Sequence, residues 1–267
     1  MKIEELVGRL DDDFGNEVVE ELLRRSRRRV NNALRHIRRP QAAVGVVKSP
    51  LGNLLVALTE RGIVLNHYLL DGGDLAATIA RLRLELDPVE DRRTIGEVGA
   101  EIRSYLGGAA KALRQKIDLT LATSPFQKKV LRELQEIPRG AVASYQALGA
   151  AVGTPRGARA VGNALHNNPV PIYVPCHRVI NSDGRIGGYG GGAARKRQLL
   201  RCEGFELDKA DMRIPDDVVW GYQGNKVYCR TNCRTAARMD RARLLFFADA
   251  KQAQRAGLRP CKICRPG

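Results

Sequence analysis

The residues best suited to chemistry are an adjacent cysteine and histidine, Cys176 and His177, within the segment NNPVPIYVPCHRVI at residues 167–180. The thiolate is the nucleophilic form of cysteine, and a neighbouring base or positive charge produces it near neutral pH. The prolines restrain the backbone before Cys176, and the apolar residues between them indicate a partly buried segment. Many buried cysteines are inert core residues, so the pair alone predicts a nucleophile only if the fold brings a base to the thiol.

Four further cysteines lie near the C-terminal end as two close pairs, Cys229-x3-Cys233 and Cys261-x2-Cys264, with 27 residues between the pairs. Two close pairs of thiolates suit a tetrahedral Zn²⁺ ion, so the spacing predicts a structural zinc site formed by these four residues. A segment of fifty residues with few apolar side chains also needs such a metal to fold. We expect removal of the metal to unfold only this tail.

The charge of the chain indicates a polyanionic partner. The 267 residues carry a formal net charge of +16, and residues 218–267 alone hold eleven basic and two acidic residues. Residues 24–39 add eight arginines and no acid. A basic stripe of this kind is the electrostatic footprint of a nucleic-acid-binding surface, although a solubilising surface looks the same. The hydrophobic fraction of 43% excludes a disordered chain, and no apolar run is long enough to cross a membrane.

The elements that must position these residues fall into four parts. We expect a basic helical extension at 1–40, a small mixed α/β domain at 41–120, a helical domain bearing Cys176 at 121–210, and a small four-cysteine domain at 218–267. Short apolar runs broken by turn residues predict strands within 42–70, and helical patterns cover 74–86 and 96–107. The overall class is therefore α/β plus α. The extension either docks on the next domain or contacts nucleic acid.

Successive short helices are predicted within residues 124–166. Ser124 and Ser144 are suitable N-caps, and Pro155 is expected to start the last helix, which ends near His166. Two short helices joined by a tight turn containing glycine resemble a helix-turn-helix. The second helix carries small residues around Arg159, which suits either close approach to a DNA groove or tight packing on the core.

The sequence Pro-Cys-His-Arg-Val, preceded by Asn-Pro-Val-Pro, resembles the active-site signature of the O6-alkylguanine-DNA alkyltransferases, also called methylated-DNA–protein-cysteine methyltransferases. The resemblance runs from about Val44 through GAVASYQALGAAVGTPRGARAVGNALHNN and GGYGGG to LLRCEGFEL, ending near Leu207. It implies irreversible, single-turnover transfer of an alkyl group from O6-alkylguanine, and also from O4-alkylthymine, to Cys176. No cofactor is implied for this transfer.

The resemblance also implies roles for individual residues. His177 would take the thiol proton through a water molecule, Glu203 would orient His177, and Tyr145 would donate to the leaving guanine. Asn168 would hold the turn before the active-site segment. The residues implied in DNA binding are Arg159, Ala158, Gly162 and Arg178, and those implied in the base pocket are Val174, Tyr189 and Gly190.

Three positions stand outside the family pattern. Gly190 occupies a position where many relatives have serine, which puts the substrate range in question. His166 stands where an arginine is common, which predicts a weaker phosphate contact. Cys202, next to Glu203, matches no family role and is interpreted as a core thiol.

The tail from VYCRTNCRTAARM to GLRPCKICRPG resembles the zinc domain of Ada-type alkylation-response proteins. In that family the first cysteine of the first pair, which corresponds to Cys229, is both a zinc ligand and an acceptor of methyl groups from DNA phosphotriesters. Such modules also occur with a purely structural zinc and a basic DNA-binding face. Both interpretations stay open at the level of sequence.

Taken together, these patterns predict a DNA repair protein that binds double-stranded DNA containing alkylated bases and flips the damaged base into its pocket. The absence of a signal peptide pattern favours a cytoplasmic, nucleoid-associated monomer with no membrane contact. The alternative is a non-catalytic protein that recognises alkylated DNA and marks it for another pathway. The presence of Cys176 favours repair, because recognition proteins of that sort lack the acceptor cysteine.

Overall fold

The computed structural model of the chain describes residues 20–21, 23–26, 39–69, 72–207, 219–222, 224–230, 233 and 244–266. The chain divides into two compact units, residues 1–40 and 41–267. In the first unit, residues 20–21 and 23–26 are helical, with Arg24 and Arg25 paired to glutamates one turn earlier. The rest of the predicted N-terminal helical extension lies outside the described residues.

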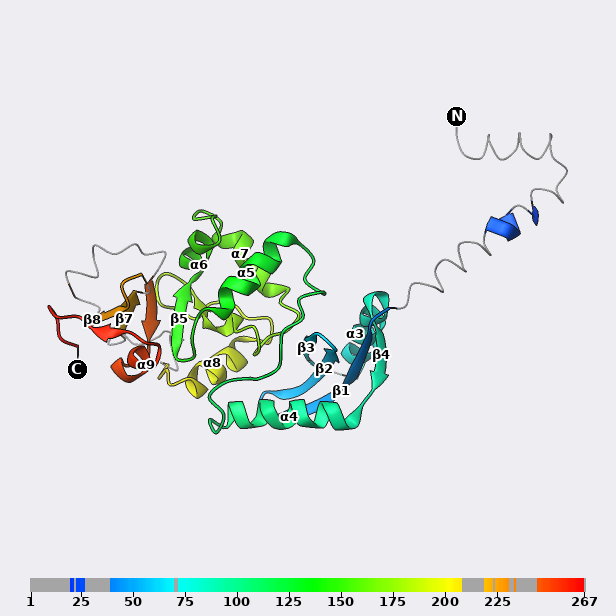
Figure 1. Ribbon diagram of the computed structural model, residues 1–267, viewed down its shortest axis with the longest axis horizontal. Coiled ribbons are helices and arrows are strands. Elements are labelled where there is room, and N and C mark those ends of the chain that lie inside the picture. Colours follow the sequence, from blue (N-terminus) through cyan, green and yellow to red (C-terminus); the bar gives the residue numbers. More distant parts are fainter. Residues whose placement is uncertain are drawn as a thin grey trace, which may run out of the picture. The chain divides into compact units, whose positions relative to one another are not determined.

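The second unit begins with a four-stranded sheet (Figure 1). Strands β1 (Gln41–Ser49), β2 (Gly52–Thr59) and β3 (Gly62–Tyr68) form an antiparallel meander, as the turn residues between the apolar runs predict. A fourth strand, β4 (Asp87–Glu90), pairs in parallel with β1 and gives the order β3-β2-β1-β4. This short strand was not predicted from the sequence, because its residues lack an apolar alternation.

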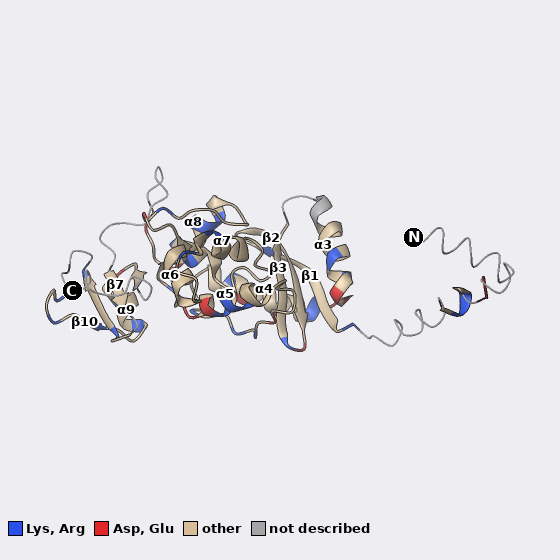
Figure 2. Cartoon of the chain, turned by 90° about the horizontal axis from the view of Figure 1, so that it is seen from above, with Lys and Arg blue, Asp and Glu red and all other residues tan. Residues whose placement is uncertain are grey.

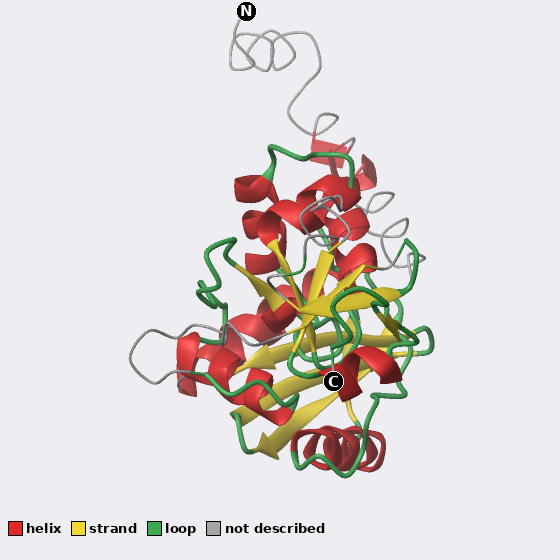
Figure 3. Ribbon diagram, turned by 90° about the vertical axis from the view of Figure 1, so that its left-hand side faces the viewer, coloured by secondary structure: helices red, strands yellow, loops and turns green. Residues whose placement is uncertain are grey.

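Helices cover both faces of this sheet, and the side chains of β2 alternate between them. Leu54 and Val56 pack toward α4 (Arg92–Leu106), which is seen end-on at the bottom of Figure 3, while Leu55 and Ala57 pack toward α3 (Gly72–Glu85). Asp91 caps α4 by accepting from the backbone N–H of Thr94, so the helix starts four residues before the predicted range.

The helical part follows the predicted caps closely. Ser124 and Ser144 cap α5 (Pro125–Gln135) and α6 (Tyr145–Ala151) by accepting backbone N–H donors. The next helix, α7 (Ala158–His166), starts three residues later than predicted, because residues 155–157 form a turn closed by a bond from the Gly157 amide to the Thr154 carbonyl. The remaining elements are the strand β5 (Ala141–Ser144), the 3₁₀ turn η1 (Cys176–Arg178), the strand β6 (Val179–Ile180) and the helix α8 (Ala193–Cys202).

The C-terminal module consists of β7 (Val219–Tyr222), β8 (Val227–Arg230), β9 (Leu244–Phe247), α9 (Ala250–Arg255) and β10 (Arg259–Pro260). Its strands join β5 and β6 in one six-stranded sheet of order β10-β8-β7-β9-β5-β6. The module therefore shares one sheet with the helical part, an arrangement that the sequence did not predict. Within the described residues, no helix combines the length and the apolar character that crossing a membrane requires.

Candidate active site and metal centre

Cys176 begins a 3₁₀ turn at the end of a tightly held loop. The side chain of Asn168 ties this loop together: its Oδ1 accepts from the Val170 amide at 3.0 Å, and its Nδ2 donates to the Val174 carbonyl at 2.9 Å. The same Nδ2 lies 3.2 Å from the Cys176 sulfur and donates to it. Asn168 therefore fixes the loop and at the same time stabilises the thiolate form of Cys176.

The thiol of Cys176 is buried, with 7% of the residue exposed. Burial raises its pKa, whereas the Asn168 hydrogen bond and the positive charge of Lys196 lower it. The raising effect of burial is the largest, so the thiol form of Cys176 is favoured near neutral pH.

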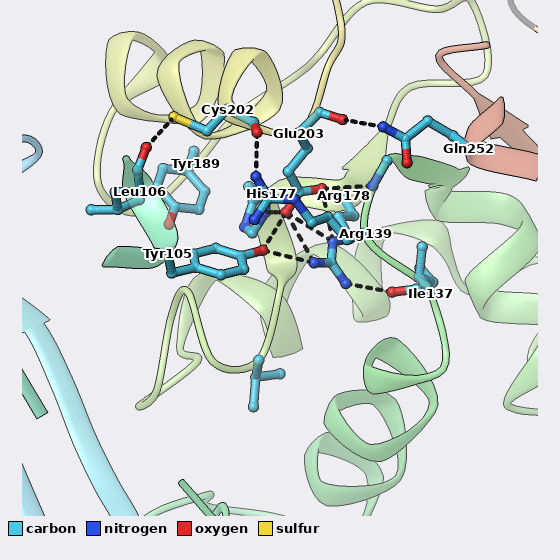
Figure 4. A network of polar contacts seen from close by, with 12 residues as sticks. Tyr105, Leu106, Ile137, Arg139, His177, Arg178, Tyr189, Cys202, Glu203 and Gln252 are labelled. Carbon is cyan, nitrogen blue, oxygen red and sulfur yellow. Dashed lines mark hydrogen bonds and ion pairs between the residues drawn. The ribbon is translucent and has the colours of Figure 1, made fainter. Parts of the chain in front are cut away.

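His177, the predicted base, points its Nε2 at Glu203 Oε1 across 2.8 Å (Figure 4). Both side chains are fully buried. Burial lowers the pKa of His177, although Glu203 opposes this shift, so the imidazole is neutral near pH 7 and able to accept a proton. Its Nδ1 has no hydrogen-bond partner among the described residues. A buried nitrogen without a partner is a suitable site for a bridging water molecule.

Glu203 is the centre of a larger polar network that the sequence did not predict. Besides His177, its carboxylate accepts from the Tyr105 hydroxyl at 2.8 Å, from the Gly140 amide at 3.3 Å, and from Arg178 Nε and Nη2 at 3.0 and 2.9 Å. Arg178 and His177 lower the pKa of Glu203 well below its usual range despite burial. The carboxylate therefore stays ionised and holds the imidazole in one orientation.

The structure corrects the expected role of Arg178. Its side chain is buried rather than directed to DNA, and besides Glu203 it donates to the Tyr105 hydroxyl and the Ile137 carbonyl. An arginine engaged with a buried carboxylate and two further acceptors has no free donor face for a phosphate. Arg178 belongs to the Glu203 network instead.

Lys196 of α8 is a further site residue that the sequence analysis missed. It has no exposed surface, and its Nζ donates to the carbonyls of Val179 and Gly188 at 2.6 and 3.2 Å. Burial lowers the pKa of Lys196 to about 8, and the neighbouring Cys176 opposes this shift. A buried lysine is rare, and its ammonium group stabilises a thiolate nearby. The signal in the sequence was a lysine at a core-facing position of α8.

A cavity of about 820 Å³ opens beside the thiol, and its lining includes Cys176, Asn168, Tyr189 and Gly190. The third predicted pocket residue, Val174, has no exposed surface and is not part of this lining. Tyr145, which was predicted to donate to the leaving guanine, donates its hydroxyl to the Gly188 carbonyl at 3.4 Å. Burial raises the pKa of Tyr145, and a negative charge on Cys176 adds to this shift, so the hydroxyl keeps its proton near neutral pH.

The pocket wall is held by a residue from the first sheet. The hydroxyl of Tyr68 at the end of β3 is 2.9 Å from that of Tyr189, and Arg195 lies over the Tyr68 ring. A side chain at Gly191 would collide with the Tyr68 ring, at 2.7 Å from its nearest atom, so the close approach requires glycine there.

The predicted DNA-facing helix, α7, has one buried and one open side. Val161, Ala164 and Leu165 face the core, while Ala158 and Arg159 are exposed and Gly162 is half-buried. His166 is exposed at the end of the same helix. Together α6 and α7 form the helix-turn-helix arrangement, with Arg159 at the open N-terminal end of its second helix.

The sulfur atoms of Cys229, Cys233, Cys261 and Cys264 all lie within 4.8 Å of one another. Tetrahedral zinc with Zn–S distances of about 2.3 Å places its sulfur ligands about 3.8 Å apart, so the cluster fits this ion. Backbone amides of Arg230 and Ile263 donate toward Cys264 and Cys261 sulfur at 3.5 and 3.4 Å, as is suitable for thiolate ligands. The four cysteines therefore form a structural zinc site.

The surface around this site is basic (Figure 2). Asp249 is the single acidic residue among the described residues of the module, and it caps α9. The described basic residues of the module are Lys226, Arg230, Lys251, Arg255, Arg259, Lys262 and Arg265.

Comparisons with known proteins agree with this geometry. The family model of the 6-O-methylguanine DNA methyltransferase DNA binding domain matches residues 125–205, and that of the metal binding domain of Ada matches residues 206–267. A methylated-DNA–protein-cysteine methyltransferase of Methanosarcina barkeri is 36% identical over 160 residues, covering 59% of this chain and 94% of the relative. One of Mycolicibacterium paratuberculosis is 42% identical over 114 residues, covering 43% of this chain and 68% of the relative.

Solved structures show the same similarity. The Mycobacterium tuberculosis O6-methylguanine methyltransferase is 33% identical with a TM-score of 0.51, covering 61% of this chain and 92% of its own. A second structure from that organism, solved in complex with DNA, is 30% identical with a TM-score of 0.50 over the same shares of the two chains. By its sequence, its fold and its cysteine–histidine–glutamate site, the chain belongs to the methylated-DNA–protein-cysteine methyltransferase family, extended at its C-terminal side by a metal binding domain of the Ada type.

Proposed function

We propose that this chain repairs alkylated DNA by moving the alkyl group from O6 of guanine to Cys176, once per molecule. The observation that carries the proposal is the arrangement around the thiol. Asn168 donates to the sulfur at 3.2 Å, and a neutral, buried His177 is held by Glu203 at 2.8 Å. This is the nucleophile, base and orienting group that a displacement by sulfur needs.

In the proposed step the Cys176 sulfur attacks the alkyl carbon, an S–C bond forms, and the C–O6 bond breaks. The thiol proton passes to His177 Nδ1 through a water molecule, and Glu203 stabilises the resulting imidazolium. The departing guanine takes the bond's electron pair and receives a proton from the Tyr145 hydroxyl. A thioether does not return to a thiol under these conditions, so each molecule is consumed by one transfer.

The base must leave the duplex for this step, because Cys176 is buried at the bottom of its cavity. We assign the exposed face of α7 to the DNA groove, with Ala158 and Gly162 allowing close approach and Arg159 occupying the space left by the base. Flipping costs a few kcal/mol, and an inserted side chain offsets part of that cost. Alkylated guanine pairs poorly, which favours its selection.

The cavity also suits O4-alkylthymine, which presents the same alkyl–oxygen bond. Gly190 contributes no hydroxyl to the pocket, and a Cβ built there would have only the His166 carbonyl near it, at 3.6 Å. The pocket therefore has room for alkyl groups larger than methyl on either base.

For the C-terminal module we propose a structural zinc and DNA-phosphate contacts through its basic residues. The alternative, methyl transfer from phosphotriesters to Cys229, is disfavoured because Cys229 has no exposed surface. We further propose that the protein acts as a cytoplasmic monomer associated with the nucleoid, on double-stranded DNA with alkylated bases.

The test is intact-mass measurement followed by peptide mapping after incubation with duplex DNA carrying O6-methylguanine and methylphosphotriesters. A single added methyl group on the Cys176 peptide, absent in Cys176→Ala, supports base repair with a structural module. Methyl groups on both the Cys176 and Cys229 peptides would overturn the structural assignment of Cys229. Tight binding of methylated DNA without any methylation of Cys176 would favour the non-catalytic recognition protein instead.

A further inference from the structure

The zinc module and the helical part share one β-sheet. Strand β9 of the module pairs antiparallel with β5, with Ala141 opposite Phe247 and Val142 opposite Phe246. The next strand outward from β9 is β7, which pairs with β8, the strand that carries Cys229. In Figure 1 the module accordingly lies directly beside β5.

The two parts also share their hydrophobic core. Phe247 is fully buried in the same cluster as Cys176. Phe246 packs against a second cluster, which includes Val142 of β5 and Phe205, two residues after Glu203 in the sequence. Small metal-binding modules lose their fold when the metal is removed, and β9 would then no longer pair with β5. Loss of zinc is therefore expected to loosen the sheet at β5.

A specific contact connects the module to Glu203 (Figure 4). Gln252 of α9 donates from its Nε2 to the backbone carbonyl of Glu203 at 3.5 Å. Its side chain also packs on Gly140, where an added Cβ would lie 2.6 Å from Gln252 Oε1, and Gly140 has a φ of +77°, which favours glycine. The Gly140 carbonyl accepts from the Ala248 amide at 3.2 Å.

Gly140 is in turn a direct partner of the catalytic carboxylate, because its amide donates to Glu203 Oε2 at 3.3 Å. The module thus holds both the backbone of Glu203 and one of the donors that orient its side chain. The C-terminal end of α9 leads directly to the metal site. The Leu258 amide donates to the Ala253 carbonyl of α9 at 3.0 Å, and three residues later the amide of the metal ligand Cys261 donates to the Tyr228 carbonyl of β8 at 2.9 Å.

We propose that Gln252 is a positioning residue for Glu203. Through Gln252 the zinc module contributes to alkyl transfer to Cys176, in addition to any contact that it makes with DNA. The proposal rests on the proposed transfer reaction. It requires that loss of the contact between Gln252 and Glu203 alter the chemical step even when DNA binding is unaffected.

The first experiment compares Gln252→Ala with Gln254→Ala in the full, zinc-loaded chain. Gln254 lies on the same helix, but its Nε2 donates to the Tyr228 hydroxyl at 2.8 Å inside the module, so it is a matched control. The measurement is the single-turnover rate of methyl transfer from saturating O6-methylguanine duplex across a pH series, together with the Kd for that duplex.

Gln252→Ala should lower the rate constant of methyl transfer about two- to tenfold, which corresponds to the loss of one hydrogen bond that stabilises the reactive geometry. The Kd for the duplex should stay unchanged. Because Glu203 raises the pKa of His177, a less well held Glu203 should also move the acid limb of the rate profile to lower pH. Gln254→Ala should leave rate and profile unchanged. Wild-type rate and profile in Gln252→Ala, or equal losses in both variants, would overturn the proposal.

The second experiment does not depend on the reaction. Hydrogen exchange of the full chain is measured with zinc bound and after removal of zinc by a chelator. We expect faster exchange at the amides of residues 140–144 as well as in the module. Acceleration confined to residues 219–266 would show that the module unfolds alone and would overturn the coupling. If wild-type protein transfers no alkyl group, the proposed function fails, and the exchange data still decide whether the module supports β5.

Discussion

Tyr105 donates a 2.8 Å hydrogen bond to Glu203 although 98 residues separate them in the sequence. Tyr105 lies on α4, which packs on the first sheet, whereas Glu203 follows α8 in the helical part. Burial, together with the negative charge of Glu203, raises the pKa of Tyr105 to about 12, so the hydroxyl keeps its proton and donates at any physiological pH. The α/β domain thus contributes directly to holding the Glu203 carboxylate.

Replacement of Tyr105 by phenylalanine should therefore weaken both the fold and the site. A buried hydrogen bond to a charged acceptor contributes about 1.5–3 kcal/mol, and we expect a loss of this order in the free energy of unfolding measured with urea. The transfer rate should fall several-fold because Glu203 gains freedom. A Tyr105→Phe variant with wild-type stability and rate would show that the hydroxyl is not needed.

Removal of the Arg178 charge tests the corrected role of this residue. Arg178→Met leaves a buried carboxylate without its main counter-charge, and breaking a buried pair in this way costs about 3–5 kcal/mol. The melting temperature should fall sharply, as differential scanning calorimetry would show. If the variant instead kept its stability and lost affinity for undamaged DNA, the result would support the original prediction that Arg178 contacts a DNA phosphate.

The protonation of His177 predicts the acid side of the pH profile. Because burial lowers the pKa of this imidazole from its ordinary value of 6.5, the neutral form that accepts the thiol proton persists below that pH. The single-turnover rate should therefore fall to half of its maximum only below pH 6.5. Stopped-flow transfer measurements between pH 5 and 8 check this, and a half-maximal rate above pH 6.5 would contradict it.

Lys196 predicts the reactivity of the thiol. Its ammonium group favours the Cys176 thiolate, so Lys196→Met should slow alkylation of Cys176 by iodoacetamide about tenfold at pH 7, the effect of a shift of one unit in the thiol pKa. The pKa of Lys196 is about 8, and above it the wild-type lysine loses its charge. The difference between the two proteins should therefore narrow from pH 8 to pH 9. A constant ratio over that range would exclude a charge effect.

Replacement of Arg159 tests whether this residue acts in flipping the base rather than in the transfer step. Arg159→Ala should lower the transfer rate from O6-methylguanine in duplex DNA at least tenfold, because nothing then fills the space left by the extruded base. Transfer from the free base O6-benzylguanine, which needs no flipping, should stay within twofold of wild type. Equal losses with both substrates would place Arg159 in the chemistry or in the fold.

Local signals predicted much of this architecture. The adjacent Cys176 and His177, the caps Ser124 and Ser144, and the paired cysteines of the tail are all short-range patterns, and the structure places each at a loop, helix start or metal cluster. Such patterns depend on residues a few positions apart, whose geometry the backbone largely determines.

The partners contributed by distant segments could not be predicted in this way. Arg178 looks like any basic residue near a DNA-binding site, and only the packing of α4 and α8 shows that Tyr105 and Glu203 enclose it. Lys196 was missed because a charged residue in a helix usually faces water. The pairing of β9 with β5 rests on two residue pairs about a hundred positions apart, and neither strand carries a local signal for its partner.

The shared sheet has a consequence for shortened forms of this chain. A polypeptide ending at Leu207 would leave β5 as an open edge strand, with an unpaired row of backbone groups where β9 now lies. It would also remove Phe246 and Ala248, which now pack against the apolar cluster around Val142. An exposed edge beside bare apolar side chains is a template for strand addition between copies. In the full chain β9 pairs with β5 and covers this edge, which prevents strand addition between copies of the repair domain.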